Sequence, residues 1–196
     1  MNKNTRKELL RWALIALIAL VLYLTGLHVP VIGFLQRGLL ATGLIRPAVE
    51  LPVNGSHTTF PQVNLDIQLE SADGQVLNMK QFQGKVLFIN LWATWCPPCL
   101  AEMPNLNHLY NDLSDEDIQF LMIATDQDFS KATDFVHQKG YHFPIYRIHH
   151  DWPKALDSST LPTTFVIDKQ GRIVLDHRGM AQYNTKKFKA FLLGLN

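Results

Sequence analysis

The strongest constraint on the fold is the junction between an apolar run and the two cysteines of the chain. Residues 86–92 are apolar except for Asn90, a pattern typical of a strand buried on both faces. Cys96 and Cys99 follow at once, in the run Trp95-Cys96-Pro97-Pro98-Cys99, and a helical repeat of apolar residues begins at Leu100. We therefore expect both cysteines at the start of a helix that follows a central strand.

Two cysteines with two residues between them at a helix start suit dithiol redox chemistry. The sulfurs can close a small ring, and the partial positive charge of the helix N-terminus favours a thiolate on Cys96. Cys96 is then the nucleophile and Cys99 the resolving thiol. A structural zinc site would need four ligands, and haem attachment would need His where Leu100 stands. An inert structural disulfide is the alternative that stays open.

The N-terminus is basic and then apolar. Four Lys or Arg residues and one acid lie within the first eleven residues, and no charged side chain follows between Trp12 and Leu35. This length predicts a bilayer-spanning helix, and no small-residue cleavage site follows directly, as a signal peptide would have. We expect residues 1–35 to be an uncleaved single-pass anchor. Basic residues stay on the cytoplasmic side, so the rest should lie outside the cytoplasm, in a bacterium the periplasm or outer envelope face.

Composition and charge divide the remainder. Residues 36–61 are semi-apolar and then rich in Pro and Gly, which predicts a membrane-proximal segment and linker. Residues 62–196 suffice for one domain. The first fifty residues carry six Lys or Arg against two acids, whereas residues 51–196 carry twelve against fifteen. A faintly acidic domain without a basic stripe argues against nucleic-acid binding.

The apolar periodicity of residues 62–196 predicts an α/β domain with a central mixed sheet flanked by helices. Strict alternation over 63–69 and a turn at Asp73-Gly74 predict an N-terminal β-hairpin with residues 75–79. The other predicted elements are strands at 118–124, 163–168 and 172–175 and helices at 130–139, with Ser130 as its cap, and at 184–193.

The motif residues together resemble the thioredoxin superfamily, and within it the membrane-anchored TlpA/ResA-type thiol-disulfide oxidoreductases. The resemblance rests on residues 90–99, on the hairpin before them, and on residues 161–168, which read Leu-Pro-Thr-Thr-Phe-Val-Ile-Asp, with the later Gly171. It covers most of the domain and implies a thioredoxin-like fold behind an N-terminal transmembrane helix.

The resemblance also implies a client-binding surface around the cysteines. Pro162 is expected to be cis and to face the cysteine pair, and the backbone of Leu161 is expected to pair with an extended client segment. We expect Trp95 to form a rim against the client. Pro97 and Pro98 have no N–H, so fewer backbone donors can stabilise a Cys96 thiolate than in a strong oxidant.

Two polar residues are expected near the dithiol. Asn90 stands where thioredoxin itself has a buried acid, and the TlpA/ResA-type proteins share this Asn together with a glutamate that matches Glu102. Glu102 lies three residues after Cys99, on nearly the same helix face. We expect it to be the acid/base for Cys99. The alternative is that Glu102 only complements the helix dipole.

The resemblance implies a reductase of client disulfides, such as those of apocytochrome c, that needs no cofactor beyond its own Cys96–Cys99 disulfide and draws electrons from a membrane thiol-disulfide donor. A dithiol oxidase or isomerase is one rival, and its disulfide would be far easier to reduce. A copper chaperone that uses the cysteines and a histidine is another. His149 and His150 are adjacent and would point to opposite faces of a strand, so we expect solvated histidines and no metal site.

Overall fold

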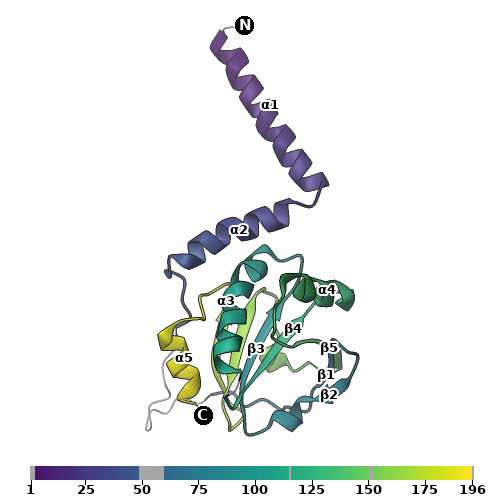
Figure 1. The fold of residues 1–196 in the computed structure, drawn as a ribbon, viewed down its shortest axis with the longest axis vertical. Helices are drawn as coiled ribbons and strands as arrows, with labels where there is room; N and C mark the ends of the chain where they lie inside the picture. The colour runs from purple at the N-terminus through teal and green to yellow at the C-terminus, as the bar shows by residue number, and fades with distance from the viewer. Residues whose placement is uncertain (1–2, 49–59, 115, 151, 196) are drawn as a thin grey trace.

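The computed structural model describes residues 3–48, 60–114, 116–150 and 152–195, and seven strands within them form one mixed sheet in the order β2-β1-β5-β4-β3-β6-β7 (Figure 1). The strands are β1 (Gln68–Ser71), β2 (Val76–Asn78), β3 (Val86–Trp92), β4 (Ile118–Ala124), β5 (Ile145–His150), β6 (Thr163–Ile167) and β7 (Ile173–Arg178). The helices are α1 (Lys3–Leu24), α2 (His28–Ala41), α3 (Pro97–Leu113), α4 (Phe129–Lys139) and α5 (Lys186–Leu193), with 3-10 helices η1 (Met79–Phe82) and η2 (Lys154–Leu156).

The central strand β3 is buried along its whole length, as its apolar run predicts. It pairs parallel with β4 and antiparallel with β6. One apolar cluster joins the sheet to α3, α4 and α5, and a second cluster on the opposite face is closed by η1 and η2. Helices thus cover both faces, as predicted, but the α-helices gather on one. The crossovers β3-α3-β4 and β4-α4-β5 step the same way across the sheet, and because such connections share one hand their helices share a face.

The hairpin of β1 and β2 forms, but the strand predicted over 63–69 is wrong for most of its length. Only Gln68–Ser71 joins the sheet. Val63 and Ile67 are buried, yet Val63 N donates to the Gly171 carbonyl oxygen (2.9 Å) and the segment makes no regular ladder. An extended chain that packs against a core shows the same alternation as a paired strand, because its side chains also alternate in direction.

The helix predicted from Ser130 starts one residue earlier and has a different cap. Asp128 is the N-cap of α4, and its carboxylate accepts hydrogen bonds from both the backbone N–H (3.1 Å) and the hydroxyl (2.7 Å) of Ser130. Asp and Ser are comparably favourable N-cap residues, so the sequence alone did not decide between Asp128 and Ser130.

The continuous helix expected over residues 12–35 is also wrong. Helix α1 ends at Leu24, a turn follows, and α2 starts at His28. Gly26 adopts a left-handed backbone (φ 71°), a conformation that ends helices and that glycine reaches without steric cost. Among the described helices, none combines the length and the apolarity that crossing a membrane requires.

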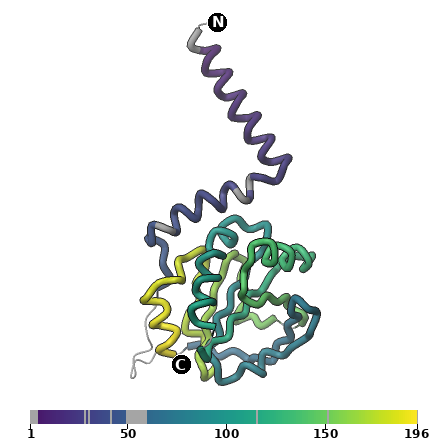
Figure 2. Tube along the Cα trace, viewed as in Figure 1, coloured from purple at the N-terminus to yellow at the C-terminus, as the bar shows by residue number. Residues whose placement is uncertain are grey.

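Helix α2 lies across the end of the sheet at which α3 begins, and α1 extends away from the domain (Figures 1 and 2). A side chain at Gly33 would place its Cβ 3.3 Å from the Pro97 carbonyl oxygen, so the two helices approach closely. After α2, Ile45 O accepts a hydrogen bond from Gln182 N (3.0 Å). The part of the predicted linker over residues 49–59 lies outside the described residues.

Candidate functional site

The two cysteines form a disulfide at the N-terminus of α3, with a Cα–Cα distance of 5.3 Å. Cys96 is the extended N-cap residue, and Pro97 and Pro98 occupy the first helical positions. Cys99 N lies 3.3 Å from Cys96 Sγ and donates to it, while the two prolines have no N–H to offer. Cys96 is 4% exposed and Cys99 is fully buried, so the predicted nucleophile is the more accessible of the two residues.

The loop between β3 and α3 is held by a residue that the sequence did not indicate. Asp126, at the end of β4, accepts hydrogen bonds from Thr94 N (3.1 Å) and Thr94 Oγ1 (2.5 Å). Trp95, next in the loop, is 60% exposed, as expected of a rim residue. It borders an open groove of about 440 Å³ that also includes Thr94, Asp126 and Lys131. Trp92 is instead fully buried and packs on Phe135.

The Leu161–Pro162 peptide bond is cis, as the resemblance implies. Thr163, the next residue, pairs with Leu91 of β3. This register carries Leu161 and Pro162 to the end of β3 that leads into the cysteine loop. The Pro162 carbonyl oxygen is taken by Gly179 N (2.8 Å), and Leu161 is half-buried.

Beneath the disulfide, a buried polar network surrounds Glu102. The Asn90 amide nitrogen donates to Glu102 Oε1 (2.9 Å) and to Thr164 Oγ1 (2.9 Å). The other carboxyl oxygen, Oε2, accepts from Ala181 N (3.0 Å). Asn90, Glu102 and Thr164 are fully buried, and Asn90 Oδ1 has no hydrogen-bond partner among the described residues. The network therefore joins α3, β3, β6 and the segment before α5.

Burial raises the pKa of Glu102 to about 8, and the hydrogen bonds from Ala181 N and Asn90 only partly oppose this rise. The carboxyl group is therefore protonated at neutral pH, since removal from water disfavours its charged form. A buried carboxyl that is neutral at this pH can give up or take up a proton during dithiol exchange, and Glu102 lies one turn after Cys99 on α3.

The structure gathers all the predicted site residues at one end of β3 and adds three that were not predicted. These are Thr164, the backbone N–H of Ala181, and Asp126. Thr164 lies opposite Asn90 in the pairing of β3 with β6, 74 residues away along the chain. Thr164 belongs to the Pro-Thr-Thr-Phe motif. The strand register that places it opposite Asn90 joins residues far apart in the sequence, so the motif alone did not predict this contact.

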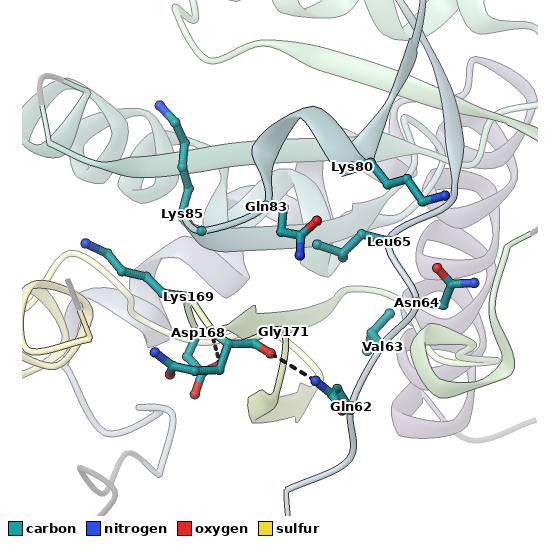
Figure 3. Close-up of a pocket in the computed structure, with 12 residues that line it drawn as sticks. Gln62, Val63, Asn64, Leu65, Lys80, Gln83, Lys85, Asp168, Lys169 and Gly171 are labelled. Atoms are coloured by element: carbon teal, nitrogen blue, oxygen red, sulfur yellow. Dashed lines mark hydrogen bonds between the residues drawn. The ribbon is translucent and has the colours of Figure 1, made fainter.

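The cavity in Figure 3 lies at the opposite end of β3 and holds no cysteine. It has a volume of about 260 Å³, and Lys80, Lys85 and Lys169 surround it. All three lysines are engaged, Lys80 with Asp66 (2.6 Å) and the other two with Asp117 (3.3 and 3.6 Å).

His149 and His150 lie at the exposed end of β5. Their rings are 4.4 Å apart, and His149 Nδ1 lies 3.5 Å from Glu70 Oε2. Within the described part of the chain, no three His, Cys, Asp or Glu residues are grouped so that they could hold a metal ion. Asp151 lies outside the described residues.

A mixed sheet, a cysteine pair at the first turn of a helix and a cis proline at the same end of the central strand define a protein of the thioredoxin-like fold with a dithiol-disulfide site. The chain belongs to the Redoxin family, whose profile matches residues 56–191. The sequence-based resemblance to ResA-type proteins is confirmed. ResA of Bacillus thuringiensis subsp. konkukian, a thiol-disulfide oxidoreductase, is 32% identical over 108 residues. These residues are 55% of this chain and 62% of ResA, so the match spans less than two thirds of that relative.

Solved structures share the fold. A thiol:disulfide interchange protein of Chlorobium tepidum TLS superposes with a TM-score of 0.60 at 20% identity, over 72% of this chain and 100% of that chain. A secreted thiol-disulfide isomerase of Corynebacterium glutamicum has a TM-score of 0.56 at 25% identity, over 76% of this chain and 97% of that one.

Proposed function

We propose that this protein is an extracytoplasmic thiol-disulfide oxidoreductase that reduces disulfides in client proteins. The observation that carries the proposal is the Cys96–Cys99 disulfide at the first turn of α3, beside the cis peptide of Leu161 and Pro162. The ResA relatives support the same activity.

The reaction starts from the reduced protein. The Cys96 thiolate attacks one sulfur of the client disulfide, forms a mixed disulfide with it, and displaces the other client sulfur, which takes up a proton. The ionised form of Glu102, which is the minor form at neutral pH, accepts the proton of Cys99, and the Cys99 thiolate attacks Cys96 Sγ. This attack displaces the second client sulfur, which takes up a proton from water. The client leaves as a dithiol, and the two electrons it gained come from the oxidation of the Cys96 and Cys99 thiols to a disulfide.

The cycle needs an outside reductant. A thiol-disulfide donor in the membrane supplies two electrons and attacks Cys96, and protonated Glu102 returns its proton to the leaving sulfur of Cys99. The paired prolines support the reductive direction. They have no N–H, so the backbone hydrogen bond to Cys96 Sγ comes from Cys99 N. A Cys96 thiolate is therefore stabilised less than the thiolate of a strong oxidant. A disulfide equilibrium with glutathione distinguishes this role from that of an oxidase, whose reduction potential would be much higher.

A trapping experiment tests the activity. Full-length Cys99→Ala should accumulate a mixed disulfide with a disulfide-bonded peptide, because the resolving thiol is gone. Cys96→Ala is the matched control and should form none. An apocytochrome c peptide with an oxidised cysteine pair is the first client to test. Equal trapping by both variants would refute the assigned roles.

The N-terminal segment is proposed to attach the domain to the cytoplasmic membrane of a bacterium from the outside. Its support is the basic flank before the apolar residues, which favours a cytoplasmic N-terminus. A reporter active only outside the cytoplasm, fused after Asn196, should be active. An intact but inactive fusion would reverse the orientation.

A further inference from the structure

The inner face of helix α2 packs on the turn that carries the dithiol, and its outer face is turned away from the domain. Leu40 is fully buried and Gly33 is buried, so the side toward the domain is closed. A Cβ at Gly33 would lie 3.3 Å from the Pro97 carbonyl oxygen and 3.8 Å from Leu100 Cβ. The inner face is thus in direct contact with the first turn of α3.

The outer face of α2 is apolar and uncovered. Phe34 is 71% exposed and Leu35 67%, and Val31 and Gly38, at helical spacing from them, are exposed as well. From residue 60 to residue 195, the large apolar side chains found exposed in the described chain are Val76, Trp95 and Leu193, which lie singly. Single exposed apolar residues are ordinary on a soluble surface, whereas a continuous apolar helix face marks an interaction site.

The occupant that fits this surface is a lipid bilayer. The outer face of α2 continues through the turn at Gly26 into α1, where most of the large apolar side chains from Trp12 to Leu24 are exposed and no residue is charged. Consecutive exposed residues on a helix point in all directions around it, and a partner protein or a second copy covers one side only. Lipid covers every side of a helical segment that inserts into it, whether or not the segment crosses the bilayer. Arg6, Lys7 and Arg11, at the start of α1, suit anionic headgroups.

We propose that α2 lies in the membrane surface, with its outer face in the lipid and its inner face on α3, and so holds the dithiol at the bilayer. This inference rests on the proposed function and names its substrate class as disulfides presented at the membrane surface. Packed helices lie about 8–10 Å apart, so the first turn of α3 is about one helix diameter from the lipid. The groove beside Trp95 stays open, which leaves a lateral approach to Cys96 along the membrane.

Spin labels test the position of α2 in the full chain, reconstituted in vesicles of phosphatidylcholine and phosphatidylglycerol. Nitroxides are attached singly at Phe34→Cys, Leu17→Cys and Val76→Cys in a Cys96→Ser/Cys99→Ser background. The labels at positions 34 and 17 should collide more with oxygen than with a water-soluble nickel chelate, and the label at 76 should do the reverse. A label at 34 that behaves like that at 76 overturns the proposal. A label at 34 shielded from both agents also overturns it, because a protein then covers α2.

Kinetics test the substrate class. The wild-type protein in vesicles should reduce a lipid-tethered peptide disulfide at least about tenfold faster than the same peptide in solution, since tethering raises its effective concentration. Phe34→Glu should remove most of this advantage without changing the rate with free peptide, and Val76→Glu should change neither. Equal rates with both peptides overturn the membrane-surface inference alone. A protein that reduces neither peptide overturns the proposed function, while the labels still decide the position of α2.

Discussion

Replacing Glu102 by Gln tests whether a buried, protonated carboxyl lies beneath the dithiol. Burial raises the pKa of Glu102 from 4.5 to about 8. Between these values the folded protein holds one proton more than the unfolded chain, so its stability falls as pH rises through this window. Each pKa unit corresponds to about 1.36 kcal/mol, which gives about 5 kcal/mol for the full rise and about 3–4 kcal/mol between pH 5 and pH 8.

Glu102→Gln removes this pH dependence. The wild-type protein should therefore lose about 3–4 kcal/mol of unfolding free energy relative to the variant from pH 5 to pH 8. The introduced Gln amide would also bring an N–H donor toward Asn90. Asn90 Oδ1 has no hydrogen-bond partner within the described part of the chain, so a rotated Asn90 amide can accept from that donor. The baseline cost should thus be about 1 kcal/mol at every pH.

The assay is urea unfolding of the oxidised full-length proteins in a non-ionic detergent, followed by tryptophan fluorescence at several pH values. Glu116→Gln is the matched control, since Glu116 is exposed and its loss should leave the pH profile unchanged. If the difference in unfolding free energy between the wild-type protein and Glu102→Gln is constant across this pH range, the raised pKa of Glu102 is refuted.

Stopped-flow exchange with a model disulfide tests whether Glu102 takes part in catalysis. Gln cannot accept the proton of Cys99, so resolution of the mixed disulfide should slow in Glu102→Gln. Normal resolution would leave Glu102 with a structural role.

Three further predictions follow from the geometry. Pulse alkylation of the reduced protein at graded pH should label Cys96 before Cys99, because Cys96 is at the helix N-terminus and Cys99 is fully buried; preferential labelling of Cys99 would reverse the roles. Gly33→Leu should weaken the packing of α2 on α3 and speed alkylation of Cys96, because a side chain at Gly33 would collide with Pro97. Gly38→Leu is the control and should change neither, since nothing lies within 4 Å of its Cβ. Equal alkylation rates in the two variants would show that α2 does not shield the site. Asp128→Ala should cost about 1 kcal/mol in denaturant unfolding through loss of the α4 cap, and no change would disprove that role.

Local patterns predicted the elements that stand on either side of the disulfide. The run that became β3 and the helical repeat of α3 are strong signals, because a doubly buried strand and an amphipathic helix each leave their own periodicity. The segment 63–67 shows the limit of that reasoning, since burial on one side reproduces the alternation of a strand without its hydrogen bonds. The turn at Gly26 shows another, because hydropathy reports how apolar a stretch is and not where its backbone turns.

The cysteines and the match to residues 161–168 predicted where the chemistry lies, but not the contacts that tune it. Asn90 and Glu102 were predicted near the site, whereas the hydrogen bonds from Asn90 to Thr164 and from Ala181 N to Glu102 depend on strand register and on the path of the chain before α5. Such contacts join residues far apart in sequence and leave no local pattern.

The packing of α2 on α3 has a consequence for shortened forms of this protein. A chain that began at residue 56, where the family match starts, would keep the disulfide and Glu102 but lose the helix that covers Leu100. It would gain an apolar patch beside Cys96 that the full chain does not present to water. Such a fragment should bind hydrophobic peptides less selectively, and its exchange rates would describe a wider entrance to the dithiol than the one the intact chain provides.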